Sequence, residues 1–567
     1  MLMKYVSRSS LIVMPVSAAL LLVSHAAWAA GPGVPADAGS LLQELQPSPS
    51  TAPLPNQPDL RIESKDSAAL PSSAPFLVRE IRIVGNTAFD TATLHALVAD
   101  QQGKTLTLPD LGALAARISS YYQQRGFPLA RAVIPAQTIA EGVVVIQVVE
   151  ARYGSVHFSN GSRVNTGLLE SILSPLQKGQ PVSETELDRA LLLLSDVPGV
   201  GVNAVLKPGE AVGTSDLDID TTHKEASAGS LSLDNYGNRY IGRVRVSGTA
   251  SLFNPLRHGD VLSASLISTG ERMAYGRVSY DTLLNGAGTH VGAAYSQVHY
   301  KLGDNVSALD AHGNAMVASL WLKHPVVRGK DYNVYAQIQY DAKTLEDRIG
   351  ASGLRTDRHL DNWLLSLSGN LRDGFLGSAV SAWGVGWTAG RVGFDDAAAA
   401  SSDAASAQTR GGYSKWNTNF TRLQMLDRNH SLFINVAAQW ADTNLDSAEK
   451  MSIGGPYSVR AYDVGAISGD TAYLASVELR RDMGRVAAGN LQALAFIDSA
   501  RVNINRRPWT TGDNSVSLSG VGVGLRWSSD SLWEASAFLA TKVGSSSSPL
   551  LGASSSTRGW LVVGKGF

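Results

Sequence analysis

The second half of the chain, from Ala228 to Phe567, is built from short segments in which apolar and polar residues alternate. Alternation with a period of two predicts strands that have one apolar face. Lipid cannot satisfy the backbone groups of an open sheet edge, so these strands are expected to close into a membrane barrel. The chain is therefore predicted to be mainly β, with a 16-stranded transmembrane antiparallel β-barrel formed near 229–236, 242–252, 260–269, 273–283, 289–300, 315–324, 331–344, 356–372, 378–391, 413–426, 429–441, 471–480, 491–499, 515–527, 532–542 and 559–567.

The alternation also predicts which side chains enter the barrel lumen. In the segment that turns Tyr473 toward lipid, Glu478 lies on the lumen side. In the next segment, the same parity places Phe496 and Asp498 in the lumen. The 55 glycines, 11 tryptophans and 17 tyrosines of the chain suit a large β-structure with aromatic residues at the membrane interfaces.

If the first strand of such a barrel leaves the periplasm, short periplasmic turns and longer outer loops must alternate, and the connections between the predicted strands can be assigned on that basis. Residues 327–330 and 427–428 are tight polar turns on the periplasmic side. Residues 392–412 and 441–470 are long outer loops. The Ala/Ser-rich segment 397–407 is expected to be mobile.

The loop 441–470 contains the stretch Gly-Gly-Pro-Tyr-Ser-Val-Arg-Ala-Tyr at 454–462. Two glycines and a proline predict a sharp bend. The planar guanidinium of Arg460 matches a carboxylate, and Asp498 is the candidate partner on the predicted inner wall. We predict that this loop folds back into the barrel, with its site formed by Gly454, Gly455, Val459, Arg460, Tyr462, Phe496 and Asp498.

The N-terminal residues predict a processing signal followed by a linker. Residues 1–29 combine basic residues, an apolar run and an Ala-Trp-Ala cleavage pattern, which indicates a signal peptide. Residues 30–75 are rich in proline, alanine and serine, which is typical of an extended linker. One short helix is predicted within it, capped by Asp37 or Ser40, with Leu41, Leu42 and Leu45 on one face. A helix this short needs a receptor, because it is not stable alone in water.

Residues 76–150 and 151–224 repeat the order strand-helix-helix-strand-strand. Thr107 opens a helix in the first repeat, and Ser183 with Glu186 predicts a capping box in the second. Each repeat is long enough for a compact domain.

Composition excludes several classes of function. The 48 basic and 49 acidic residues nearly cancel, which argues against a nucleic-acid partner. The chain has no cysteine and no phosphate-binding G-x-x-x-x-G-K-[ST] motif, and its 11 histidines form no pattern expected of a nucleophile and its base. Asp216, Asp218 and Asp220 alternate on one strand, which favours a solvated face over a calcium site. We expect no cofactor, no metal site and no enzymatic activity.

Several motifs resemble a known family. Residues 81–87 (Ile-Arg-Ile-Val-Gly-Asn-Thr) and 122–127 (Tyr-Gln-Gln-Arg-Gly-Phe) are similar to POTRA domains, the periplasmic modules of outer-membrane protein transporters. A pair of them, preceded by a signal peptide, a helix and a linker, resembles the two-partner secretion transporters, which include the hemolysin secretion/activation proteins. The loop is similar to the family's V-R-G-Y motif with Ala461 in third place, and Phe496 begins the F-x-D-x-G strand motif, which here ends in Ala500.

The resemblance implies a role for each part of the chain. Residues 76–150 and 151–224 would be the first and second POTRA domains in the periplasm, and 225–567 the barrel in the outer membrane of a Gram-negative bacterium. Arg460 and Asp498 would hold the loop in the pore, and the helix near 40–46 would plug it. The second strand of each POTRA domain would be a sheet edge open to an extended client, at Leu129, Ala130, Val133, Val202 and Val205. A neighbouring domain that covered these edges would prevent this binding.

The resemblance therefore implies secretion of a large partner protein, such as a hemolysin, an adhesin or a contact-dependent toxin. The partner would bind through its N-terminal secretion domain and cross the lumen in extended form, without nucleotide hydrolysis. Three alternatives stay open: an outer-membrane protein insertase of the same superfamily, a passive porin and an outer-membrane enzyme. Two POTRA domains with a plug helix argue against the first two, and the lack of a catalytic constellation argues against the third.

Overall fold

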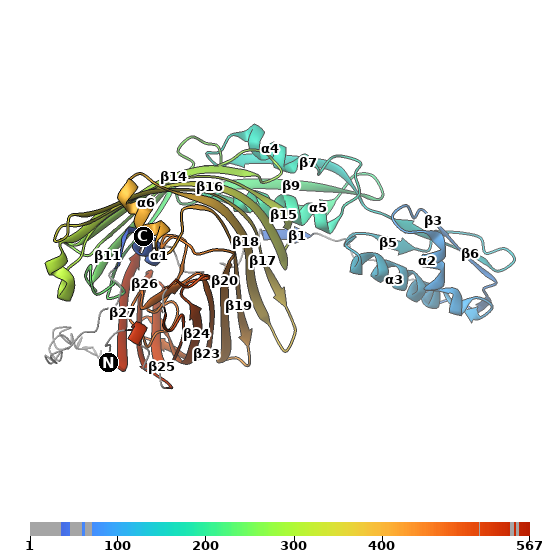
Figure 1. Cartoon of the computed structure of the whole chain (residues 1–567). Coiled ribbons are helices and arrows are strands. Elements are labelled where there is room, and N and C mark those ends of the chain that lie inside the picture. The colour runs from blue at the N-terminus through green and yellow to red at the C-terminus, as the bar shows by residue number, and fades with distance from the viewer. Residues whose placement is uncertain (1–35, 46–58, 63–70, 510, 545–548, 552–554) are drawn as a thin grey trace, which may run out of the picture.

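The computed structural model describes residues 36–45, 59–62, 71–509, 511–544, 549–551 and 555–567. The predicted signal peptide and most of the predicted linker lie outside the described residues. Figure 1 shows a barrel with one α+β unit at its end and a second α+β unit extending away from it. Within the described residues, no helix is long and apolar enough to cross a membrane.

Sixteen antiparallel strands form a closed barrel, which confirms the predicted fold. Each strand pairs with the next, and the first closes on the last through Ser230 opposite Gly566. The strands are β10 (Ser227–Asp234), β11 (Arg245–Phe253), β12 (Val261–Ser268), β13 (Met273–Leu283), β14 (His290–Lys301), β15 (Ala311–Arg328), β16 (Tyr332–Ile349), β17 (Leu354–Asp373), β18 (Ala379–Phe394), β19 (Gly411–Met425), β20 (His430–Ala441), β23 (Thr471–Val486), β24 (Gly489–Asn503), β25 (Ser515–Ser529), β26 (Trp533–Lys542) and β27 (Thr557–Gly566).

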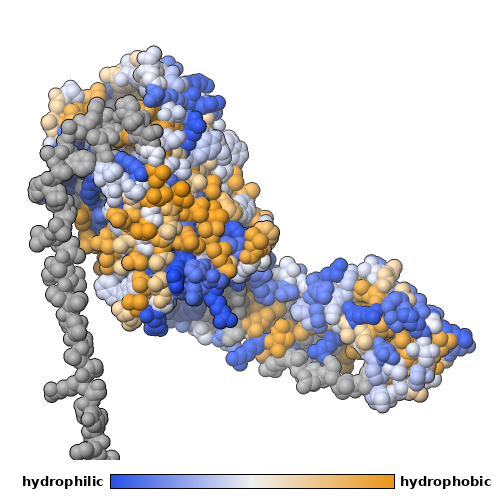
Figure 2. Space-filling view, turned by 90° about the horizontal axis from the view of Figure 1, so that it is seen from below, coloured by the Kyte–Doolittle hydropathy of each residue, from blue (hydrophilic) through white to orange (hydrophobic). Residues whose placement is uncertain are grey.

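The outer face of the barrel is apolar and the inner face is polar, as the alternation requires. Large apolar side chains are exposed on almost every strand, and Figure 2 shows hydrophobic residues gathered over the barrel surface. On β24, Ile497 is exposed whereas its neighbours Phe496 and Asp498 are buried in the lumen. Exposed apolar residues include Leu231, Val246, Leu266, Val278, Leu320, Leu365, Val523 and Leu561.

One outer loop contains a short helix. Residues expected to be mobile form the helix α6 (Ala397–Ala404), because Asp396 caps its first turn and the side chain of Asp403 accepts three hydrogen bonds from Thr409 and Arg410. Short 3₁₀ turns occur in two other outer connections, η3 (Asp304–Leu309) and η4 (Pro549–Leu551).

The first α+β unit packs two helices on a three-stranded sheet of order β3-β6-β5. Thr107 and Asp110 form a capping box at the start of α3, which buries Leu111, Leu114 and Ile118 against the sheet. The elements are β2 (Phe76–Leu77), β3 (Glu80–Val84), α2 (Thr91–Ala96), η2 (Ala99–Gln101), β4 (Thr105–Leu106), α3 (Leu108–Gln124), β5 (Arg131–Val133) and β6 (Val143–Val149).

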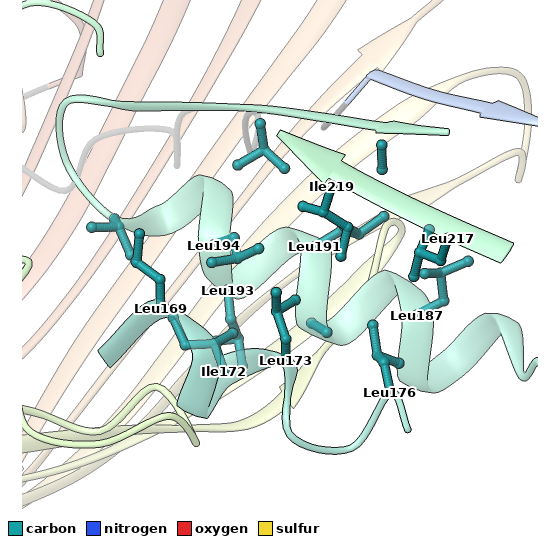
Figure 3. Close-up of a cluster of buried hydrophobic side chains, with 14 of the residues drawn as sticks. Leu169, Ile172, Leu173, Leu176, Leu187, Leu191, Leu193, Leu194, Leu217 and Ile219 are labelled. Atoms are coloured by element: carbon teal, nitrogen blue, oxygen red, sulfur yellow. The ribbon is translucent and has the colours of Figure 1, made fainter. Parts of the chain in front are cut away.

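The second unit repeats this topology with the order β8-β9-β7. Its core is a leucine-rich cluster between α4, α5 and the sheet (Figure 3). Ser183 precedes α5 but makes no side-chain capping bond, so the predicted capping box is wrong. The elements are β7 (Arg152–Gly161), α4 (Thr166–Leu173), α5 (Glu184–Asp196), β8 (Val200–Pro208) and β9 (Thr214–His223).

Helix α5 also fixes the second unit to the barrel. The Arg328 guanidinium donates from Nε and Nη2 to both carboxylate oxygens of Asp196, each at 2.7 Å. The Lys330 ammonium lies 2.8 Å from the Asp188 carboxylate, and Arg189 donates to the backbone carbonyl of Pro325. These contacts hold α5 along its length against the end of β15 and the turn that follows it.

Candidate functional site in the barrel lumen

The loop between β20 and β23 turns back into the barrel. Its two arms pair as β21 (Met451–Ile453) and β22 (Ile467–Gly469), and the tip between them carries the predicted motif. Gly454 and Gly455 have φ of 115° and 98°, which side-chain-bearing residues rarely adopt. The Gly454 N–H donates to Ser458 Oγ at 2.7 Å, and the Gly455 N–H donates to the Tyr462 carbonyl at 3.1 Å. These bonds close the tip into a compact turn.

Arg460 lies at the centre of this tip and contacts Asp498 on β24. Its Nε and Nη2 donate to the two carboxylate oxygens of Asp498 at 2.9 and 2.7 Å, and its backbone N–H donates to the same group at 3.1 Å. Asp498 is fully buried and Arg460 is 3% exposed. Arg460 and Asp498, which the sequence predicts to be a pair, are therefore in contact in the structure.

The wall supplies more partners than the predicted pair. Arg460 Nη1 donates to Glu478 Oε1 at 2.6 Å, and Arg460 Nη2 donates to Ser476 Oγ at 3.1 Å. Its guanidinium carbon lies 3.4 Å from the centroid of the Phe496 ring. Its backbone carbonyl accepts a hydrogen bond from Trp560 Nε1 at 2.7 Å. We call these residues, with Asp498, the loop clamp.

Sequence reasoning placed Glu478 in the lumen but did not assign it to the site, and the same alternation turns Ser476 to the lumen side. Ser476 and Glu478 are two residues apart on β23, so both side chains point to the lumen. This was the signal available in the sequence, because any inward side chain near Asp498 is a candidate partner of Arg460. Trp560 gave no such signal, since it lies 100 residues from Arg460 and meets it only through barrel closure.

Glycines on β25 make room for the tip. A Cβ added at Gly520 would lie 2.6 Å from the Ala461 Cβ, and one at Gly522 would lie 2.4 Å from the Phe496 ring. The Ala461 methyl therefore occupies the space that Gly520 leaves open. Val459 and Tyr462 are also buried in the cluster around the tip.

The predicted short helix lies inside the barrel (Figure 1). It forms α1 (Ala38–Glu44), and Asp37 is its N-cap, in a capping box with Ser40. Leu41 is fully buried, Leu42 is nearly so, and Leu45 packs at the edge of the same cluster. The surrounding lumen residues are Val298, Tyr300, Ala315, Leu345, Leu360, Val392 and Tyr413 from the wall and Leu445 and Ala448 from the loop.

Charged groups hold the start of α1. Asp37 contacts Arg358 at 3.1 Å and accepts a hydrogen bond from Ser447 Oγ at 2.7 Å. Arg358 is shared, because it also pairs with Asp347 on β16 and Asp446 in the loop, each at 2.7 Å. At the other end, Asn238 donates to Glu44 at 2.9 Å. Sequence reasoning did not find these wall partners, which lie hundreds of residues away.

The two predicted edge strands differ. In the first unit, β5 pairs with β6 on one side and forms the sheet edge, with Val133 exposed and Ala130 buried beneath it. Leu129 packs instead against the core of the second unit. In the second unit, β1 (Asp59–Ile62) pairs in parallel with β8, so that Arg61 lies opposite Val205.

The edge of β8 is therefore not open at Val205, because β1 covers residues 203–206, whereas Val202 lies outside this pairing. The covering strand comes from the linker of the same chain and not from a neighbouring domain. A strand edge offers unpaired backbone groups to any extended segment within reach, and the linker provides one.

A buried carboxylate lies at the C-terminal end of the first α+β unit. Glu150 precedes β7 and accepts hydrogen bonds from the Thr87 and Ala88 N–H groups at 2.7 and 2.8 Å and from the Tyr122 hydroxyl at 2.7 Å. The Thr87 hydroxyl also donates to it. Burial alone would raise the pKa of Glu150, but these donors outweigh it and hold the pKa below its ordinary value.

The lumen sites bind segments of the chain through packing and paired charges. In the part of the chain that the structure describes, no cluster of three or more His, Asp or Glu side chains suits a metal ion. The geometry of both sites is suited to holding an inserted segment in place.

Comparisons with known proteins agree with this architecture. The family model "Haemolysin secretion/activation protein ShlB/FhaC/HecB" matches residues 213–527, and "POTRA domain, ShlB-type" matches residues 76–151. The heme/hemopexin transporter protein HuxB of Haemophilus influenzae (strain 86-028NP) is 25% identical over 505 residues, covering 87% of this chain and 88% of that protein. The hemolysin transporter protein ShlB of Serratia marcescens is 28% identical over 309 residues, covering 53% of this chain and 51% of that protein.

A solved structure shares the fold. The structure of CdiB from Escherichia coli matches with a TM-score of 0.71 at 20% identity, covering 89% of this chain and 93% of that one. Its match spans both the barrel and the α+β region. The chain therefore belongs to the haemolysin secretion/activation protein family, the outer-membrane transporters of two-partner secretion, which have periplasmic POTRA domains.

Proposed function

We propose that this chain exports one large partner protein from the periplasm to the cell surface, with α1 as a resting plug and the loop clamp as a fixed part of the pore. Family membership and the transporters among its relatives support the export role. The partner binds in the periplasm through its N-terminal secretion domain and crosses the lumen as an extended chain.

The second α+β unit acts as a second POTRA domain, because it repeats the sheet order of the first. The open edge of β5 accepts the client first by strand addition, in which main-chain hydrogen bonds tolerate varied sequence. At β8 the client must displace β1, whose pairing spans only residues 59–62. Displacement of β1 pulls on the chain that leads to α1, so client binding and plug withdrawal are coupled.

The single observation that carries the plug proposal is the position of α1. It is a seven-residue helix with buried leucines inside a lumen, and it is joined to the rest of the protein at its C-terminal side through the linker. A helix of this length is not stable alone, so its order depends on the lumen receptor. Such an element can unfold as it leaves.

Single-channel conductance in planar bilayers tests this function. The mature protein is compared with a variant in which Ala38–Glu44 is replaced by a Gly/Ser sequence of equal length, so that the length of the linker is kept. A larger or steadier pore in the variant supports the plug. A matched control replaces the eight residues of α6 in the outer loop and is expected to leave conductance unchanged. Equal conductance of the mature protein and the plug variant would contradict gating by α1.

A further inference from the structure

A cavity of about 590 Å³ lies where the second α+β unit meets the inner wall of the barrel. Its volume is in the range of ligand-binding pockets. Helix α5 and the residue after it supply apolar groups from one side, and strands β13 to β16 supply polar groups from the other. The lining includes Leu193, Asp196, Val197, Arg277, Asp281 and Lys323.

The two carboxylates of this cavity already have partners. Asp196 forms the two-bond ion pair with Arg328 that fixes α5 to the barrel. Asp281 contacts His290 Nδ1 at 2.7 Å and accepts a hydrogen bond from Trp321 Nε1 at 2.8 Å. Asp196 is therefore paired with a cation, whereas Asp281 is held by a histidine and a tryptophan of the barrel wall.

Two cations of the cavity lack such a partner. Among the described residues, no carboxylate forms an ion pair with Arg277 on β13 or Lys323 on β15. The Lys323 ammonium instead lies 4.7 Å from the centroid of the Tyr335 ring.

Cations deeper in the lumen differ from these two. Arg460 is paired with Asp498 and Glu478, and Lys343 and Lys415 are both paired with Glu449. Each of these deeper cations thus lies against at least one carboxylate, unlike Arg277 and Lys323. Unpaired cations beside an apolar floor suit a ligand that brings a carboxylate and an apolar group together.

We infer that this cavity is an entrance subsite for the client, which takes an extended polypeptide segment with an acidic side chain. The client carboxylate pairs with Arg277 and Lys323, and a neighbouring apolar side chain packs on Leu193 and Val197. This inference rests on the proposed function. The cavity lies at the junction between the α+β units and the lumen. The client segment that enters the lumen first is therefore the one that carries the acidic and the apolar side chain.

Peptide block of the open pore tests the inference. The variant with α1 replaced by Gly/Ser is reconstituted in planar bilayers, and ten-residue Gly/Ser peptides that carry three Glu, three Gln or three Lys are added on the periplasmic side. We expect the Glu peptide to block the current at a concentration roughly tenfold lower than the Gln peptide. Arg277→Gln with Lys323→Gln should abolish this preference. Arg391→Gln removes a cation from the exposed outer wall and should keep it.

Each other outcome overturns a defined part of the proposal. A charge preference that persists in the double variant means that the general field of the pore, and not the cavity, selects acidic segments. Relief of the block by acetate at equal carboxylate concentration means that the cavity binds small anions and not a chain. A pore that does not open when α1 is replaced contradicts the proposed plug, whereas an open pore blocked equally by all three peptides contradicts the entrance subsite alone.

Discussion

Two segments lie inside this barrel, the loop tip around Arg460 and the helix α1, and the lumen holds them in different ways. The tip is tethered to barrel strands on both sides, and its arginine contacts two carboxylates, an aromatic ring and a tryptophan donor. Helix α1 is joined at its C-terminal side to the chain that leads to β1 and the α+β units, and it depends on two buried leucines and a shared arginine. The difference indicates a fixed element and a removable one in the same lumen.

Removal of the clamp arginine should have the largest effect. Arg460→Ala leaves Asp498 buried without its cation, whereas Glu478 keeps Arg480 and Arg526, and the unpaired Asp498 should destabilise the barrel by about 3–5 kcal/mol. The unfolding temperature of the detergent-solubilised protein, followed by circular dichroism, measures this loss. Arg501→Ala, on the exposed face of the same strand as Asp498, is the matched control. Equal unfolding temperatures for the two variants would mean that the tip is not a fixed element.

Truncation of the plug should change gating more than stability. Leu41→Ala truncates a fully buried side chain. We expect this to weaken the free energy with which α1 docks in the lumen by about 2–5 kcal/mol. We expect the open fraction in single-channel records to rise while the unfolding temperature of the barrel stays close to that of the parent. Leu45→Ala, at the edge of the cluster, should open the pore less often. If Leu41→Ala lowered the unfolding temperature as much as Arg460→Ala, α1 would be as much a part of the stable barrel as the loop tip, and it would not be a removable element.

The fit of the tip against β25 can be tested by a paired substitution. Gly520→Ala places a methyl group against the Ala461 methyl, and the overpacking should cost about 1–3 kcal/mol. Ala461→Gly in the same chain should restore most of the lost unfolding free energy, because it removes the other methyl group. Export of the client should recover in parallel. Absence of rescue would place the cost of Gly520→Ala at the Thr541 carbonyl, 3.3 Å from the added Cβ.

The smallest effect is expected at Glu150, a buried carboxylate that is held by neutral donors and not by arginine. Its folded pKa is lowered, so its stabilisation is complete above the unfolded pKa of about 4.3 and is lost as the pH falls through the folded value. The protection factors of the backbone amides of residues 86–89, which relate the measured exchange rate to the intrinsic rate at each pH, should stay constant from pH 7 to about 4.3 and fall below it. Glu150→Gln should exchange faster at neutral pH and lose this dependence. An unchanged profile in the variant would show that the charge of Glu150 does not hold this loop.

Much of the fold followed from local pattern. The sixteen strands and the lumen position of Asp498 were predicted from alternation, because a strand turns successive side chains to opposite faces and lipid tolerates one kind of face. The short helix was predicted from a capping residue and three leucines. Its receptor was not predicted, because Arg358 and Ser447 are brought to Asp37 by the closure of distant strands.

The sequence by itself therefore determined the barrel, the two repeated units and the pairing candidates Arg460 and Asp498. Only the tertiary structure decided that β1 covers β8, that Trp560 bonds the Arg460 carbonyl and that Gly520 faces Ala461. The physical reason is the separation along the chain of the residues that interact. Alternation and capping act between residues close in sequence, whereas an edge, a cavity or a clamp exists only after strands from separate parts of the chain have paired.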